Sequence, residues 1–173
     1  ANTPFFSSNG KLRGTKGDVF EGGIRVPMIA RWPGKIAPGT VSNHVSVQYD
    51  VMATLAAITR QQISATDGIS FLPTLLGKNA KQVEHPFLYF EFPETGGQLA
   101  IRMGKWKGVK RDMHKNPDKP WMLFDLESDP SESTDVVLQH PEIILQLEQI
   151  ARREHQHPIL KEWELFSEHT NNY

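Results

Sequence analysis

The chain of 173 residues carries a formal net charge of −1, because 19 Lys and Arg residues are balanced by 20 Asp and Glu residues. This balance excludes a generic polyanion binder, since a nucleic-acid-binding domain usually carries a basic surplus on one face. The chain contains no cysteine, which excludes a disulfide framework, a thiolate metal site and a Cys nucleophile within it. The hydrophobic content of 38% is typical of a globular protein, and no apolar run approaches the ~20 residues of a membrane span.

The first part of the chain combines a glycine-rich loop with a short apolar run. Residues 1–23 contain five glycines, and so long an irregular stretch is usually functional in a compact domain. The composition of residues 24–32 predicts a buried strand, with Pro27 near its start, where a missing backbone donor matters least. Because the sequence starts directly in a loop, we expect the chain to be part of a longer protein or a processed product.

Two helices are expected next along the chain. Residues 49–61 place apolar side chains at helical spacing, and Asp50 is suited to cap the N-terminus of this helix. Residues 67–78 predict a second, short helix, with Pro73 in its first turn and Gly77 at its end.

After residue 81 the pattern changes to short runs rich in aromatic and branched residues, separated by turn-forming segments. Such runs are typical of an antiparallel meander, and they occupy residues 85–92, 96–104, 105–111 and 121–127. Residues 140–155 carry the strongest helical pattern of the chain, with Pro141 at the first helical position. The sequence therefore predicts an α/β part that lacks its earlier strands, followed by an α+β unit in which about four strands are packed by one helix.

Five segments in a fixed order carry a resemblance to a known family. Residues 12–40 contain the pattern K-G-x-x-x-E-G-G-x-R-x-P followed by W-P-G. Four further segments follow in the family's order, namely residues 45–60, 67–77, 100–110 and 122–132. Together they resemble the C-terminal portion of the type I (formylglycine-dependent) sulfatases, the arylsulfatase family of the alkaline phosphatase superfamily. The resemblance implies that residues 1–80 end an alkaline-phosphatase-like α/β domain and that residues 81–173 form a C-terminal α+β subdomain.

The resemblance also implies a chemistry that this chain does not hold by itself. Sulfatases hydrolyse sulfate esters with a formylglycine made from Cys or Ser in a C/S-x-P-x-R motif, and they bind a divalent metal, usually calcium. No residue of this chain stands in that motif, and the family's metal-binding residues precede the segment seen here. We therefore expect no cofactor and no metal in this chain, assign Asn9 to no metal, and expect the isolated chain to be inactive. The family resemblance further implies a secreted or periplasmic location.

The resemblance assigns Lys16 to the lysine that contacts the sulfate group. A lysine ammonium can stabilise the negative charge that builds on the bridging and sulfuryl oxygens as the S–O bond breaks. Arg13 and His114 are weaker candidates for contacts to an anionic substrate. The residues expected to support the loop are Glu21, Gly22, Gly23 and Arg25. The two glycines would allow a close backbone approach, and the Glu and Arg would pair to brace the loop.

Three hypotheses about the function stay open at this point. The first is a sulfatase that acts on a sulfated small molecule or glycan, with no nucleic acid partner and no membrane span. The second is a phosphatase or phosphonate hydrolase of the same superfamily, and the third is a non-catalytic partner- or glycan-binding module. If the chain folds alone, the apolar edge at residues 24–32 predicts self-association. A metal site at His155 and His157 is not expected, because two residues apart on a helix their side chains would diverge.

Overall fold

The computed structural model describes residues 6–167, which divide into two compact units. The larger unit combines residues 6–26 with residues 87–167, and the smaller unit comprises residues 27–86. The glycine-rich loop therefore belongs to the same compact unit as the C-terminal sheet, although the whole smaller unit separates them in the sequence. The boundary expected between residues 80 and 81 concerns the domains of a longer protein and stays a prediction.

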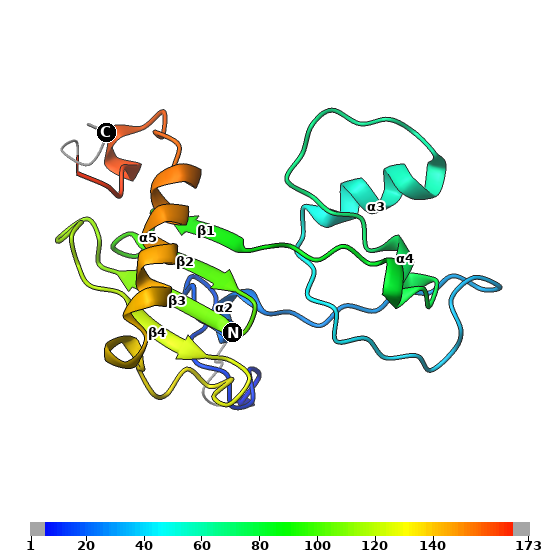
Figure 1. Ribbon diagram of the computed structural model, residues 1–173, viewed down its shortest axis with the longest axis horizontal. Helices are drawn as coiled ribbons and strands as arrows, with labels where there is room; N and C mark the ends of the chain where they lie inside the picture. The colour runs from blue at the N-terminus through cyan, green and yellow to red at the C-terminus, as the bar shows by residue number, and fades with distance from the viewer. Residues whose placement is uncertain (1–5, 168–173) are drawn as a thin grey trace. The chain divides into compact units, whose positions relative to one another are not determined.

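The larger unit is built on a four-stranded antiparallel sheet with the strand order β1-β2-β3-β4 (Figure 1). Its strands are β1 (Leu88–Phe92), β2 (Gln98–Met103), β3 (Trp106–Arg111) and β4 (Met122–Asp125). The predicted meander is thereby confirmed, since each of the four apolar runs forms one strand. Ala100 lies opposite Val109, and Arg102 lies opposite Lys107. Because residues two apart share a face, these four side chains point to the same side of the sheet.

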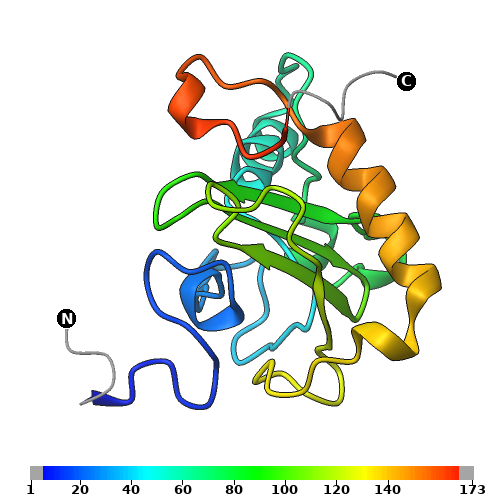
Figure 2. The same ribbon diagram turned by 90° about the vertical axis from the view of Figure 1, so that its left-hand side faces the viewer.

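Helix α5 (Pro141–Glu154) covers one face of the sheet (Figure 2). It begins at Pro141, as predicted, because a proline has no N–H group to leave unpaired at the first helical position. Leu147 is fully buried in one cluster with Leu99 of the sheet. Gly108 permits this close packing, since a Cβ at that position would lie 2.4 Å from Cδ1 of Leu147.

The opposite face of the sheet is covered by the N-terminal loop and the short helix α2 (Glu21–Ile24), drawn in blue in Figure 2. Val19 and Phe20 are buried there in one cluster with side chains of the sheet, which are Ala100, Val109 and Phe124. The rings of Phe20 and Phe124 meet edge to face, with their centroids 6.1 Å apart. Two short 3₁₀ helices, η2 (Val137–Gln139) and η3 (Lys161–Trp163), complete the described part of this unit.

The smaller unit contains α3 (Asp50–Thr59), α4 (Leu72–Leu75) and the 3₁₀ helix η1 (Asn79–Lys81). Its connections meet at the fully buried carboxylate of Asp50. This carboxylate accepts hydrogen bonds from the backbone N–H groups of Val47 and Ile69, each at 2.8 Å, and Nε2 of His85 lies 2.8 Å from it. The sequence-based assignment of Asp50 as the helix cap is wrong, because Tyr49 occupies the N-cap position and Asp50 is the first residue of α3. Its carboxylate instead joins three separate segments of the unit.

The strand expected at residues 24–32 does not form. After α2, this stretch has no regular secondary structure, and Ile29 is 95% exposed. On α3, Met52 and Leu55 are also exposed, so much of its apolar stripe is uncovered. A strand needs a neighbour to satisfy its N–H and C=O groups, and no described strand pairs with this stretch. None of the helices within residues 6–167 has the length and apolar character that a membrane span requires.

Candidate active-site loop

Lys16 lies in a turn of the loop that covers the sheet, and it is exposed. Within residues 6–167 its side chain makes no hydrogen bond or ion pair. Its ammonium group is therefore available to a ligand rather than committed to an internal partner. The backbone around it, in contrast, is fixed by side chains of the sheet.

Asp18 and Gln98 hold the turn on both sides of Lys16. One carboxylate oxygen of Asp18 accepts the N–H of Thr15 at 2.9 Å, and the other pairs with Arg111 of β3 at 3.2 Å. Gln98 of β2 donates from Nε2 to the carbonyl of Gly17 at 2.8 Å. Gln98 and Arg111 are paired across β2 and β3. This one cross-strand pair therefore binds both residues that follow Lys16, Gly17 and Asp18.

Gly22 and Gly23 allow the loop to fold back so closely on itself that neither position has room for a side chain. A Cβ added to Gly22 would lie 2.4 Å from the carbonyl oxygen of Gly14, and one added to Gly23 would lie 2.0 Å from that of Asp18. Both obstacles are backbone atoms, which cannot move aside without breaking the turn. Asn9 closes the same loop, because its Nδ2 donates to the carbonyls of Gly14 and Gly22, each at 2.7 Å.

Glu21 is the buried end of a charge cluster that the sequence reasoning did not find. Its main partner is Lys107 of β3, whose Nζ lies 2.9 Å from Oε1 of Glu21 and 2.9 Å from Oε1 of Glu132. All three side chains are at most 4% exposed. The expected pair with Arg25 exists only as a 4.0 Å contact from a side chain that is 61% exposed, and Arg102 approaches Glu21 at 3.9 Å. Lys107, rather than Arg25, is therefore the principal brace of Glu21.

Glu132 fastens the cluster to the backbone of the loop. Its Oε2 accepts the N–H of Glu21 at 2.6 Å. Burial raises the pKa of Glu132 above its ordinary value, and this is opposed by the positive charge of Lys107 and by the hydrogen bond from Glu21. The residue also has a left-handed backbone, with φ of +53°, so the turn that presents it is strained for a side chain of this kind.

The structure places Arg13 and His114 in contacts of their own. Nη1 of Arg13 donates to the carbonyl of Glu132 at 2.8 Å, and its guanidinium lies 4.0 Å from the centre of the Phe20 ring. Nε2 of His114 lies 2.7 Å from the carbonyl of Pro93. Both residues are exposed, so contact with a substrate stays a proposal, while support of the loop is the role that the contacts of Arg13 show.

One signal in the sequence could have revealed Lys107. In the segment KWKGVKR, alternation places Lys107 and Arg111 on the same face as Val109, which is buried. A lysine among buried side chains requires an anionic partner, and Glu21 was the available buried carboxylate of the loop. Glu132 carried no comparable signal, because it stands in a turn between a strand and a helix.

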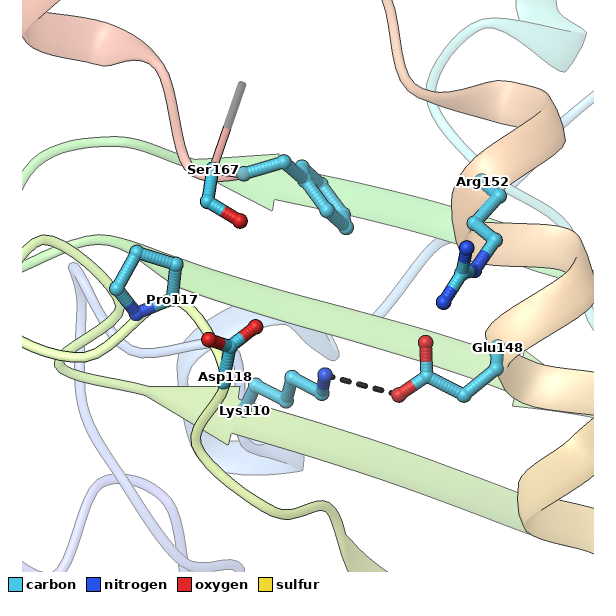
Figure 3. A pocket seen from close by; sticks show the side chains of 7 residues that line it. Lys110, Pro117, Asp118, Glu148, Arg152 and Ser167 are labelled. Carbon is cyan, nitrogen blue, oxygen red and sulfur yellow. Dashed lines mark hydrogen bonds and ion pairs between the residues drawn. The ribbon is translucent and has the colours of Figure 1, made fainter. Parts of the chain in front are cut away.

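A small cavity lies on the other face of the sheet, beside α5 (Figure 3). Its volume is about 110 Å³, and its lining residues are Lys110, Pro117, Asp118, Glu148, Arg152, Phe166 and Ser167. Lys110 pairs with Glu148 at 2.9 Å, and Trp121 donates to the same carboxylate at 2.7 Å. Because Lys110 and Arg111 are neighbours on one strand, they point to opposite faces. The cavity is therefore not part of the Lys16 loop.

The side chains present do not provide the ligands of the calcium ion that the resemblance implies. Among residues 6–167, one group of three or more potential metal ligands comes together, and it consists of His155, His157 and Glu164. Calcium prefers six to eight oxygen ligands, whereas this group offers two imidazoles and one carboxylate. This group of described residues therefore does not fit a calcium ion.

Comparison with known proteins decides the family. A family model described as N-sulphoglucosamine sulphohydrolase, C-terminal, matches residues 15–157, which include Lys16 and the whole sheet. The chain belongs to this sulfatase family. The four-stranded sheet with its helix is thus confirmed as the C-terminal part of an alkaline-phosphatase-like sulfatase.

Curated sulfatases match most of this chain but only a part of themselves. The chain is 34% identical over 154 residues to N-acetylgalactosamine-6-O-sulfatase of Bacteroides thetaiotaomicron, a match that covers 82% of this chain and 29% of the relative. It is 37% identical over 145 residues to arylsulfatase A of Bos taurus, with coverages of 72% and 28%. The sulfatase chain thus spans less than a third of the length of these relatives.

Solved structures give the same result. One is a structure described under the metabolism of multiple glycosaminoglycans by Bacteroides thetaiotaomicron. It superposes on this chain with a TM-score of 0.70 at 30% identity, and the match covers 88% of this chain and 34% of the solved one. The crystal structure of Ps i-CgsB in complex with k-i-k-neocarrahexaose superposes with a TM-score of 0.67 at 27% identity, with coverages of 92% and 34%.

Proposed function

We propose that this chain is the C-terminal part of a sulfatase that hydrolyses sulfate esters of a carbohydrate, and that Lys16 contacts the sulfate group. The observation that carries this proposal is the contrast between the free ammonium group of Lys16 and the fixed backbone that presents it. Asp18 and Gln98 hold the turn, and the buried Lys107 cluster holds the segment that follows. A ligand-binding side chain needs such a rigid support to act at a defined position.

The chemistry of sulfate-ester cleavage gives Lys16 a defined task. A sulfate ester carries one negative charge on its sulfuryl oxygens, and further charge develops on the bridging oxygen as the S–O bond breaks. An ammonium group placed against these oxygens in a water-poor pocket stabilises the transition state more than the ground state. We assign Lys16 this binding and charge-stabilising role, and we assign the nucleophile and the divalent metal of the reaction to parts of the complete enzyme outside this chain.

The proposal of a carbohydrate substrate rests on the relatives. An N-acetylgalactosamine-6-O-sulfatase and a solved structure in complex with k-i-k-neocarrahexaose both align with most of this chain. Within the complete enzyme, the exposed residues Ile29, Met52 and Leu55 would be covered by the remainder of the α/β domain. Without that remainder we expect the chain to be inactive and prone to self-association through these side chains.

A substrate panel tests the proposed activity directly. The complete protein that contains this chain is assayed against sulfated monosaccharides, an aryl sulfate and the matching phosphate monoesters at equal concentrations. We expect release of inorganic sulfate from a sulfated sugar, with kcat/KM well above that for the phosphate monoester. Preferential release of phosphate, or no hydrolysis of any ester, would overturn the proposal.

A further inference from the structure

His155, His157 and Glu164, which follow the C-terminal end of α5, form a compact cluster outside the Lys16 loop. One ligand atom from each of His155, His157 and Glu164 can be chosen so that all three lie within 4.8 Å of one another. Nε2 of His155 lies 2.9 Å from Oε1 of Glu164, and Nδ1 of His157 lies 2.8 Å from Oε2 of the same residue. The expectation that the two histidines diverge is wrong, because α5 ends at Glu154 and the chain then turns, bringing the two rings to a centroid distance of 5.3 Å.

His155 is held in an orientation that points one ring nitrogen at the carboxylate of Glu164. Its Nδ1 lies 2.7 Å from Oε1 of Glu91, which in turn accepts the hydroxyl of Tyr89. The His155 side chain is 6% exposed, and its ring packs 4.4 Å from that of Phe166. A carboxylate on Nδ1 selects the tautomer that carries the proton there, and such an outer carboxylate is the usual support of a metal-bound histidine.

That tautomer leaves a lone pair on Nε2, directed at a negatively charged group. The buried Nε2 has no hydrogen bond within the described part of the chain, although Oε1 of Glu164 is only 2.9 Å away. Two electron-rich atoms at this distance repel each other unless a cation lies between them. The unpartnered, buried nitrogen is therefore an independent sign that this place takes a positively charged ligand.

We propose that His155, His157 and Glu164 bind a divalent transition-metal ion, with zinc as the best match. Two imidazoles, one carboxylate and a water molecule form a common four-coordinate zinc set. At zinc–ligand distances of ~2.0–2.1 Å, tetrahedral ligands lie about 3.3 Å apart. The contacts of 2.9 and 2.8 Å are made to the two different oxygens of Glu164, and the three ligand atoms lie within 4.8 Å of one another. Side-chain shifts of up to ~1.5 Å would therefore bring all three to tetrahedral spacing. The exposed side of His157 leaves access for the ion and its water.

The site joins the end of α5 to the segment that follows it and to β1 through Glu91. Binding of the ion would therefore fix residues 155–164 against the sheet. This role is separate from sulfate-ester cleavage, because the cluster lies outside the Lys16 loop and shares none of its supporting side chains.

Zinc titration of the complete protein by calorimetry, in excess Ca²⁺ to fill any calcium site, tests the proposal. The test variants are His157→Ala, which removes an exposed ligand without disturbing the core, and Glu164→Gln. The control is His140→Ala, which removes a half-buried histidine that also lies 3.3 Å from a glutamate. We expect the wild type and the control to bind one more equivalent of zinc than either test variant, or to bind that equivalent at least tenfold more tightly.

Thermal unfolding supplies a second readout that does not depend on activity. Zinc should raise Tm of the wild type and of His140→Ala, and should leave Tm of His157→Ala unchanged. Equal zinc stoichiometry and affinity in all variants would overturn the proposal. Failure of the wild type to take up the additional zinc would overturn it as well.

Discussion

Replacement of Lys107 by Met removes the only cation at the centre of the Glu21–Lys107–Glu132 cluster in the described structure, while it keeps most of the side-chain volume. The ammonium lies 2.9 Å from each carboxylate, and all three groups are buried. Removal of one partner from a buried ion pair costs about 3–5 kcal/mol, because an uncompensated charge remains inside. We expect a loss in this range, since Arg102 at 3.9 Å and Arg25 at 4.0 Å are too distant to replace the lysine.

Amide hydrogen exchange on the complete protein measures this loss locally. A cost of about 3–5 kcal/mol lowers the protection of the β2 and β3 amides by about two to three and a half orders of magnitude. The control is Lys105→Met, which removes an exposed lysine that pairs with Asp125 at 2.6 Å, and we expect its protection to stay near that of the wild type. Adding Glu21→Gln and Glu132→Gln to Lys107→Met should restore part of the protection. Equal protection in Lys107→Met and Lys105→Met would refute the reasoning.

Three further predictions concern the supports of the two units. Gly23→Ala places a methyl group 2.0 Å from the carbonyl oxygen of Asp18, so we expect turnover to fall by at least tenfold, and unchanged kcat in the complete enzyme would contradict this. Asp50→Ala removes two hydrogen bonds and the contact with His85, each worth about 1.5–3 kcal/mol, so exchange within residues 27–86 should rise while β2 and β3 stay protected. Burial raises the pKa of Glu132, so its contribution to stability is complete below the ordinary glutamate pKa and is lost as pH rises through the raised value. The stability advantage of the wild type over Glu132→Gln, measured as the difference between their Tm values, should therefore shrink from pH 4 to pH 8. A difference that stays constant over this range would contradict the raised pKa of Glu132.

The sequence predicted the elements that depend on local patterns. The four strands follow from short apolar runs between turn residues, and α5 follows from a proline followed by a helical stripe. The close approach at Gly22 and Gly23 was also readable, because adjacent glycines between charged residues indicate a place without room for a Cβ. These features need only neighbouring residues in the chain to explain them.

Contacts between residues far apart in the sequence could not be predicted from local patterns. The partners of Glu21 are Lys107 and Glu132, which lie far along the sequence and meet Glu21 only because the loop returns to the sheet. The helical reasoning about His155 and His157 failed because it placed the end of α5 too late. The prediction of a strand at residues 24–32 was wrong for a different reason. The local pattern is that of a strand, but no described strand pairs with this segment.

The turnover of Lys16→Ala in the complete enzyme tests the central claim most directly. Lys11→Ala is the matched control, because Lys11 is an exposed lysine of the same loop. If Lys16 stabilises the sulfate group in the transition state, kcat for sulfate-ester hydrolysis falls by about 10²-fold or more while Tm stays near wild type. Lys11→Ala should keep wild-type turnover. A kcat of Lys16→Ala equal to that of the wild type would contradict the assignment of this loop to the active site.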